Sequence, residues 1–133
     1  MKKEWIIWII ILIIIFLVAF LRFNPLNGGE DNWIKDSRGV YVKHGNPAQT
    51  PDYVLTQENI INKATELYNN KKAEGMAFSS QCLGSVEDYA VDIVHVPRTN
   101  EDDVIENQCS DYRVGKVSHF IELDKNGDIV RIV

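Results

Sequence analysis

An apolar run near the start of the chain constrains its fold more than any other feature. The residues from Trp5 to Leu21 are almost all Ile, Leu, Val and Phe, and none of them is charged. As a helix with a rise of 1.5 Å per residue the run would measure roughly 25 Å, and about 28 Å if it extends to Phe23. Because that length suits a slightly thin bilayer, we predict a transmembrane helix over residues 5–23.

The flanks of this run favour an uncleaved signal-anchor. A cleavable signal peptide has a shorter apolar core and a small-x-small site, whereas residues 17–22 contain no pair of small residues three apart. Cleavage and a buried soluble helix are the alternatives. Lys2 and Lys3 precede the run and Arg22 follows it, so the positive-inside rule favours a cytoplasmic tail at residues 1–4. The expected location is the cell membrane, single-pass, with the lipid bilayer as a partner and the rest of the chain extracytoplasmic.

The part of the chain after this helix is acidic. Residues 1–23 hold one acidic and three basic side chains, so 18 of the 19 acidic and 11 of the 14 basic residues follow them. A nucleic-acid partner would need a basic face that displaces counterions from phosphates, and no Lys or Arg cluster occurs beyond Lys71-Lys72. We therefore expect no nucleic-acid binding, and a surface or envelope protein remains a candidate partner.

The two cysteines, Cys82 and Cys109, both lie in the part expected outside the cell. An even pair in an oxidising compartment is typical of a structural disulfide. It would close a loop of roughly 27 residues and contribute about 3 kcal/mol in the chain-entropy model. The alternative is a redox or nucleophilic thiol, although no Cys-x-x-Cys motif occurs.

Turn signals divide the remaining chain into three parts. Residues 24–32 contain Pro and Gly and predict a polar tether, and residues 33–55 predict a small hairpin and an irregular segment. In that hairpin, two β-rich triplets flank an Asp-x-x-Gly turn in which Gly39 supplies the positive φ. Residues 56–133 predict a single α+β extracytoplasmic domain.

An amphipathic helix and three strands are expected in this domain. Thr56 resembles an N-cap, Glu74-Gly75 ends the helix, and apolar residues recur between them at helical spacing. That apolar stripe consists of Ile60, Ile61, Ala64, Leu67 and Tyr68. Residues 89–96, 116–124 and 128–133 predict strands, with an Asn-Gly turn before the last one. We expect a three-stranded antiparallel meander with the helix over one face.

Two of the three histidines, His95 and His119, define a candidate metal site. If their strands pair antiparallel, the two imidazoles lie nearly opposite each other on one face. A loop carboxylate could then complete a transition-metal site. The candidate third ligands are Asp102, Asp103, Glu106 and Asp111. The alternative is two partly buried histidines bonded to backbone or loop groups, and a register slip of one residue would separate them.

A cysteine-dependent hydrolase is the enzymatic alternative. Cys82 and His119 would supply its nucleophile and base. Cys82 follows a helix and has no basic neighbour, and Cys109 offers it a pairing partner. The pairs Ser79-Ser80 and Ser118-His119 lack a Gly-x-Ser-x-Gly context. We therefore predict no catalytic residue and no cofactor.

Three segments look like parts of small, uncharacterised archaeal membrane-anchored proteins: Val42–Pro47, Glu106–Cys109 and Lys116–Asp124. This resemblance implies an N-terminal span and assigns no activity or site. The helix-on-meander order also resembles cystatin-like and PepSY-like extracytoplasmic domains, which implies a fold and transfers no site.

Taken together, these features predict a single-pass membrane protein that presents an extracytoplasmic α+β binding or interaction domain, without evident catalysis. The cysteine hydrolase and the transition-metal domain are its two alternatives.

Overall fold

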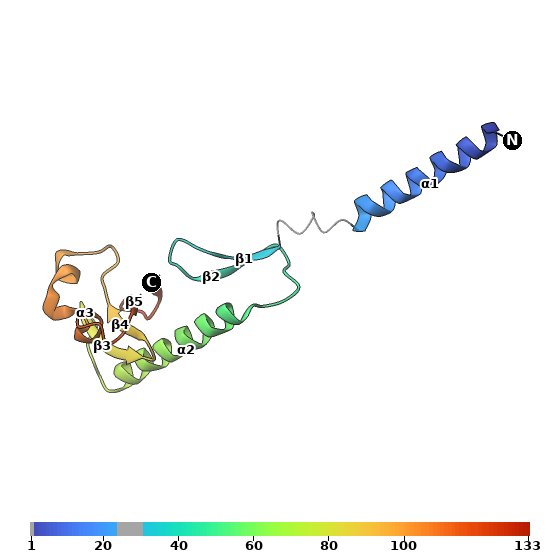
Figure 1. Ribbon diagram of the computed structural model, residues 1–133. Coiled ribbons are helices and arrows are strands. Elements are labelled where there is room, and N and C mark those ends of the chain that lie inside the picture. The colour runs from blue at the N-terminus through green and yellow to red at the C-terminus, as the bar shows by residue number, and fades with distance from the viewer. Residues whose placement is uncertain (1, 24–30) are drawn as a thin grey trace.

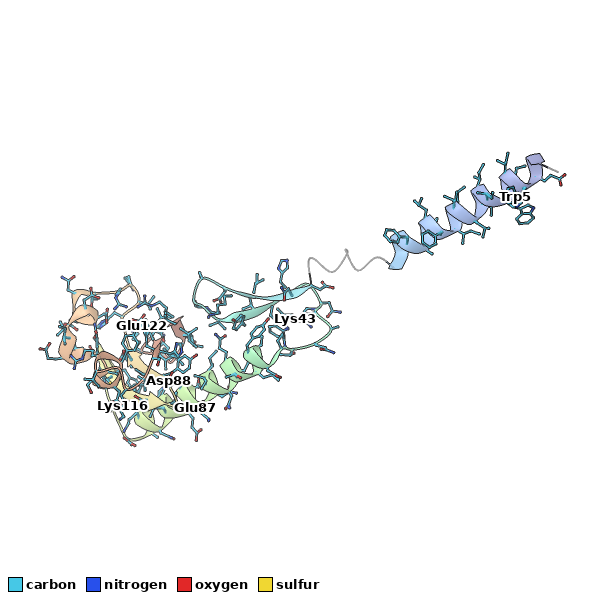
Figure 2. The ribbon with its side chains drawn as sticks, in the orientation of Figure 1. Trp5, Lys43, Glu87, Asp88, Lys116 and Glu122 are labelled. Atoms are coloured by element: carbon cyan, nitrogen blue, oxygen red, sulfur yellow. A yellow bond between two sulfur atoms is a disulfide. The ribbon has the colours of Figure 1, made fainter. Side chains whose placement is uncertain are left out.

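A computed structural model describes residues 2–23 and 31–133 (Figure 1). The first helix, α1, spans Lys2–Phe23 and confirms the helical part of the N-terminal prediction. Its side chains are largely exposed, including Trp5 (Figure 2) at 70% and Phe16 at 73%. Among the described residues, no helix combines the length and the apolar character needed to cross a membrane. Residues 24–30 of the predicted tether lie outside the described residues.

The predicted hairpin is confirmed. Strands β1 (Asn32–Lys35) and β2 (Tyr41–His44) pair antiparallel. The Asp36 carboxylate accepts the backbone N–H groups of Arg38 and Val40 at 2.9 and 3.0 Å, and Gly39 has φ +83°. These contacts form a tight turn that only a residue tolerant of positive φ can close.

The long helix α2 spans Asp52–Ala73 and begins earlier than the sequence pattern predicted. Its N-cap is Pro51, and Asp52 lies in the first turn, where the helix dipole favours an acid. Thr56 is therefore inside the helix, and its hydroxyl donates to the Asp52 carbonyl at 2.8 Å. The predicted end is confirmed, since Glu74 is the C-cap and Gly75 has φ +83°.

The predicted three-stranded antiparallel meander is wrong in strand number and in direction. The sheet has four strands in the order β3 (Gln81–Val86), β4 (Tyr89–Ile93), β5 (His119–Leu123) and β6 (Ile129–Ile132). Strand β3 pairs antiparallel with β4, and β4 pairs parallel with β5. Because β3 occupies one side of β4, β5 joins the other side, and the connection between them returns to the starting end of the sheet. The predicted Asn-Gly turn between the last two strands is confirmed, and β5 and β6 pair antiparallel.

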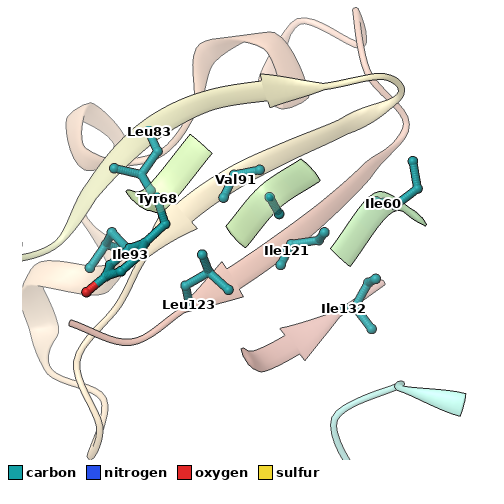
Figure 3. Packing of buried hydrophobic residues seen from close by; sticks show 9 residues of the cluster. Ile60, Tyr68, Leu83, Val91, Ile93, Ile121, Leu123 and Ile132 are labelled. Carbon is teal, nitrogen blue, oxygen red and sulfur yellow. The ribbon is translucent and has the colours of Figure 1, made fainter. Parts of the chain in front are cut away.

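The main hydrophobic core lies between α2 and one face of this sheet (Figure 3). Ile60 and Tyr68 of α2 face strand residues that alternate along β4 and β5. The strand residues of the cluster are Leu83, Val91, Ile93, Ile121, Leu123 and Ile132. The predicted apolar stripe of the helix is confirmed, because its remaining members also pack on this cluster.

The connection from β4 to β5 covers the opposite face of the sheet. It contains the short helices η2 (Asn100–Asp103), η3 (Ile105–Asn107) and α3 (Ser110–Arg113). A small second core of Ala90, Cys109 and Val117, with Phe120 against it, forms beneath this connection. The sheet is thus covered by α2 on one face and by this crossover segment, residues 94–118, on the other.

Candidate functional site

Four charged residues meet beneath the crossover segment. Glu122 of β5 (Figure 2) is nearly buried, and both of its carboxylate oxygens are paired with arginines. Arg131 donates two hydrogen bonds to it at 3.0 Å, and Arg98 donates one at 2.9 Å. These charges line a cavity of about 170 Å³ together with Asp92, which is the neighbour of Glu122 across the β4–β5 pair. Glu122 and its two arginines are paired with one another, and Arg98 ties the crossover segment to the sheet.

Asp92 is the poorly compensated member of this group. Burial raises its pKa to about 6, and the negative charge of Glu122 acts in the same direction. The backbone N–H of Cys109 donates to its carboxylate at 2.9 Å, and this bond and Arg98 only partly oppose the rise. Asp92 therefore takes up a proton at a higher pH than an ordinary aspartate does, and it is only partly exposed to solvent.

Asp102 organises the start of the crossover segment. Its side chain is fully buried and accepts the backbone N–H groups of Thr99 at 2.7 Å and His95 at 3.0 Å. Burial alone would raise the pKa of Asp102, but these two hydrogen bonds and one from the His95 ring hold it at about 2. Asp102 is therefore a carboxylate, which can only accept hydrogen bonds.

The His95 imidazole lies between Asp102 and Ser79. Its Nδ1 is 3.0 Å from Asp102 Oδ1, and its Nε2 is 3.5 Å from Ser79 Oγ. Thr99 Oγ1 also lies 3.1 Å from Nδ1, and Glu101 lies 4.0 Å from Nε2. Since Asp102 cannot donate, Nδ1 carries the proton toward it, and in the neutral imidazole Nε2 is left as an acceptor for the Ser79 hydroxyl.

Ser79 and His95 line a cleft of about 580 Å³ at one end of the sheet, where β3 begins and β4 and β5 end. Its walls come from the segment before β3, the segment after β4 and the β5–β6 turn. The apolar lining consists of Phe78, Val94, Val96 and Pro97, and the polar lining of Ser79, His95, Thr99, Asp124, Lys125 and Asn126. A cleft of this size that combines an apolar wall with several polar side chains can admit a small molecule.

The predicted pairing of His95 with His119 is not formed. The two histidines were expected opposite each other in an antiparallel ladder, but β4 and β5 run parallel, and Tyr89 is the partner of His119. His95 lies beyond the other end of β4. His119 instead stacks on the Tyr89 ring, with centroids 4.8 Å apart, and contacts the Val133 carbonyl.

The acidic residues considered as third metal ligands have separate roles. Asp102 contacts His95, Asp103 pairs with Arg98, and Asp111 pairs with Lys116. Glu106 is exposed on η3. The register and these pairings therefore do not assemble the predicted histidine metal site.

The predicted cysteine pair is present. Cys82 and Cys109 lie at disulfide distance, with Cα atoms 4.7 Å apart. A paired Cys82 has no thiolate for the proposed hydrolytic attack. Cys82, Cys109 and Asp92 bring ligand atoms within 4.8 Å of one another, but sulfurs joined to each other are not thiolate ligands.

The sequence interpretation overlooked the arrangement of Ser79, His95 and Asp102. The sequence predicts His95 and Asp102 only as metal ligands, and it excludes Ser79 because no Gly-x-Ser-x-Gly motif surrounds it. A local signal did exist, because Thr99 followed three residues later by Asp102 is a capping-box pattern that fixes this loop. Comparisons with known proteins found no matching family model, curated protein or solved structure.

Proposed function

We propose that this chain is a single-pass membrane protein that holds an α+β binding domain on the extracytoplasmic side. The apolar run from Trp5 to Leu21 and the exposed side chains of α1 support the anchor. The cysteine pair supports the location, since structural disulfides persist in oxidising compartments. The proposal of an anchor therefore depends on the apolar run and its exposure, whereas the proposal of a binding role depends on a cleft in the α+β domain.

One observation carries the binding role: the cleft beside His95. Val96 forms part of its apolar wall and is 65% exposed, so an apolar ligand group would cover a side chain that now faces water. Lys125 adds a cation at the rim, and Asp124, also in the lining, is occupied by the backbone of its own turn. The ligand class that fits is a small molecule with an apolar body and an anionic or ester head.

Nuclear magnetic resonance of the full chain in micelles tests this site with 4-phenylbutyrate as the probe. We expect saturable amide shifts in the three lining segments, centred on Phe78, Val96 and Asn126. Val96→Asp should weaken binding at least tenfold, because it places a charge in the apolar wall. Val114→Asp is the matched control, since Val114 is 75% exposed and lies outside the cleft lining. Shifts that are absent, or equal in both variants, would contradict the cleft as the binding site.

Carbonate extraction tests the anchor. We expect the full chain to stay in the membrane pellet and Ile10→Arg/Ile13→Arg to move to the supernatant, because charge in an apolar span is costly. Ile10→Leu/Ile13→Leu is the matched control and should stay in the pellet. Recovery of the unmodified chain in the supernatant, with both thiols reactive, would contradict both the membrane anchor and the extracytoplasmic location.

A further inference from the structure

We infer that Ser79, His95 and Asp102 form a nucleophile, base and orienting acid that hydrolyse a carboxylic ester bound in the cleft. The inference rests on the proposed function, because it assigns chemistry to a ligand held at the same site. Its basis is the geometry: Asp102 Oδ1 is 3.0 Å from His95 Nδ1, and Nε2 of the same ring is 3.5 Å from Ser79 Oγ.

The three side chains are exposed to the degree that these roles require. Ser79 is exposed, the His95 side chain is one-third exposed, and the Asp102 side chain is buried at 0%. An accessible nucleophile can reach a ligand, whereas a buried carboxylate holds the imidazole in one orientation. A hydroxyl–imidazole distance of 3.5 Å is long, and such contacts commonly tighten when substrate binds.

Asp102 is fixed independently of His95. Its second oxygen accepts the Thr99 backbone N–H at 2.7 Å and lies 3.2 Å from the Thr99 hydroxyl. The carboxylate thus cannot rotate away from the ring without leaving a backbone donor unpaired. Asp102 is a positioning residue in this arrangement, and Ser79 and His95 are the catalytic pair.

The reaction proceeds in two balanced steps. Ser79 Oγ bonds to the ester carbonyl carbon while its proton passes to His95 Nε2, and the alcohol leaves with that proton as the C–O bond breaks. A water then bonds to the acyl carbon, gives its proton to Nε2, and the Ser79 oxygen takes that proton back as the carboxylic acid leaves. Lys125 also lines the cleft, and a cation there would favour negative charge on the carbonyl oxygen.

The cleft restricts the substrate class. Its apolar wall of Phe78, Val94, Val96 and Pro97 suits a short acyl chain or an aromatic alcohol. Ester chemistry is favoured over amide chemistry, because the ester carbonyl is less stabilised by resonance and its alcohol depends less on protonation by the site in order to leave.

The full chain in micelles tests the inference with two probes. The first is 4-nitrophenyl butyrate, whose hydrolysis releases a coloured phenolate. The second is a fluorophosphonate, whose covalent adduct is located by peptide mass spectrometry. We expect the adduct on Ser79, hydrolysis reduced to the buffer rate in Ser79→Ala, and at least a hundredfold loss of both signals in His95→Gln.

Matched controls separate the proposed pair from general surface reactivity. Ser37→Ala removes another exposed serine, and His119→Gln removes another exposed histidine. Both variants should hydrolyse the ester and take up the adduct as the unmodified chain does. Asp102→Asn is a weaker test, because Asp102 also holds the loop together.

The outcomes distinguish the two proposals. If 4-phenylbutyrate binds in the cleft but Ser79 takes no adduct and the ester turns over at the buffer rate, hydrolysis is overturned and the binding domain stands. If Ser79 reacts equally well in His95→Gln, the histidine is not its base and the inference also fails. If neither the carboxylate nor the ester is bound, both proposals fall.

Discussion

At the scale of single residues, the pKa values of Asp92 and Asp102 are shifted in opposite directions. Asp102 receives two backbone N–H groups and keeps its charge, with a pKa of about 2. Asp92 receives one backbone N–H and faces Glu122 across the strand pair, so its pKa rises to about 6. Desolvation raises the pKa of both carboxylates, and Asp102 stays ionised because more hydrogen-bond donors oppose that rise.

The raised pKa of Asp92 predicts a specific pH dependence. The folded state binds this proton more tightly than the unfolded chain, so the contribution of Asp92 to stability falls as pH rises from about 4 to about 6 and is then constant. Asp92→Asn keeps an oxygen for the Cys109 N–H and removes the charge. We expect the variant to be more stable than the unmodified chain by roughly 1–3 kcal/mol at pH 7, and by much less at pH 4.

Urea unfolding at the two pH values measures this difference. Asp103→Asn is the control, since its carboxylate pairs with Arg98 and is exposed. It should shift stability by less than about 1 kcal/mol at both pH values. A stability difference between Asp92→Asn and the unmodified chain that does not change with pH would contradict the assignment.

At the scale of elements, the parts that local signals specify were predicted and the parts that depend on distant pairing were not. The Asp36–Gly39 turn and the end of α2 follow from a few adjacent residues. Strand β3 was missed because Gly84 and polar residues interrupt its pattern. The sequence of residues 94–118 does not predict whether β5 runs parallel or antiparallel to β4. That direction depends on which side of β4 is already paired with β3.

The candidate site was missed for the same reason. Ser79 lies before β3 and His95 after β4, and the β3–β4 ladder brings these two points together. Because β3 was not predicted, no argument from sequence could place Ser79 beside the imidazole. The contact between His95 and Asp102 lies within one loop, so it is the part of the site that local sequence signals could have predicted.

Two glycines with the same backbone conformation predict different costs of substitution. Gly39 and Gly75 both have φ +83°, but a Cβ at Gly39 would collide with the carbonyl oxygen of Ile132, whereas a Cβ at Gly75 meets nothing within 4 Å. We expect Gly75→Ala to lower the free energy of unfolding by about 1 kcal/mol and Gly39→Ala by about 2–4 kcal/mol. Denaturant unfolding of both variants checks this, and equal losses would mean that Gly39 does not lie against the Ile132 carbonyl oxygen.

At the scale of the whole molecule, the crossover segment is held by a covalent and an ionic attachment. The cysteine pair joins it to β3, and Glu122 joins it to β5 through Arg98. The same segment carries Asp102 to His95. The cleft beside His95 and the cover over one face of the sheet therefore both depend on the crossover segment.

Removing the cysteine pair tests this dependence. Cys82→Ala/Cys109→Ala frees a loop with a sequence separation of 27, which should lower the free energy of unfolding by about 3 kcal/mol. The unmodified chain unfolded in reductant should lose a similar amount, which makes it the natural control. A variant as stable as the oxidised chain would show that the pair contributes no constraint.

The parallel neighbours β4 and β5 also have a kinetic consequence. A hairpin closes a loop of a few residues. The β4–β5 ladder forms only after residues 94–118 close a longer loop, which costs more conformational entropy. The β3–β4 and β5–β6 ribbons pair through short turns, so we expect joining them to be the slower step of folding. In an oxidised chain the disulfide shortens that search, and oxidised copies should reach their native state sooner than copies folded in reductant.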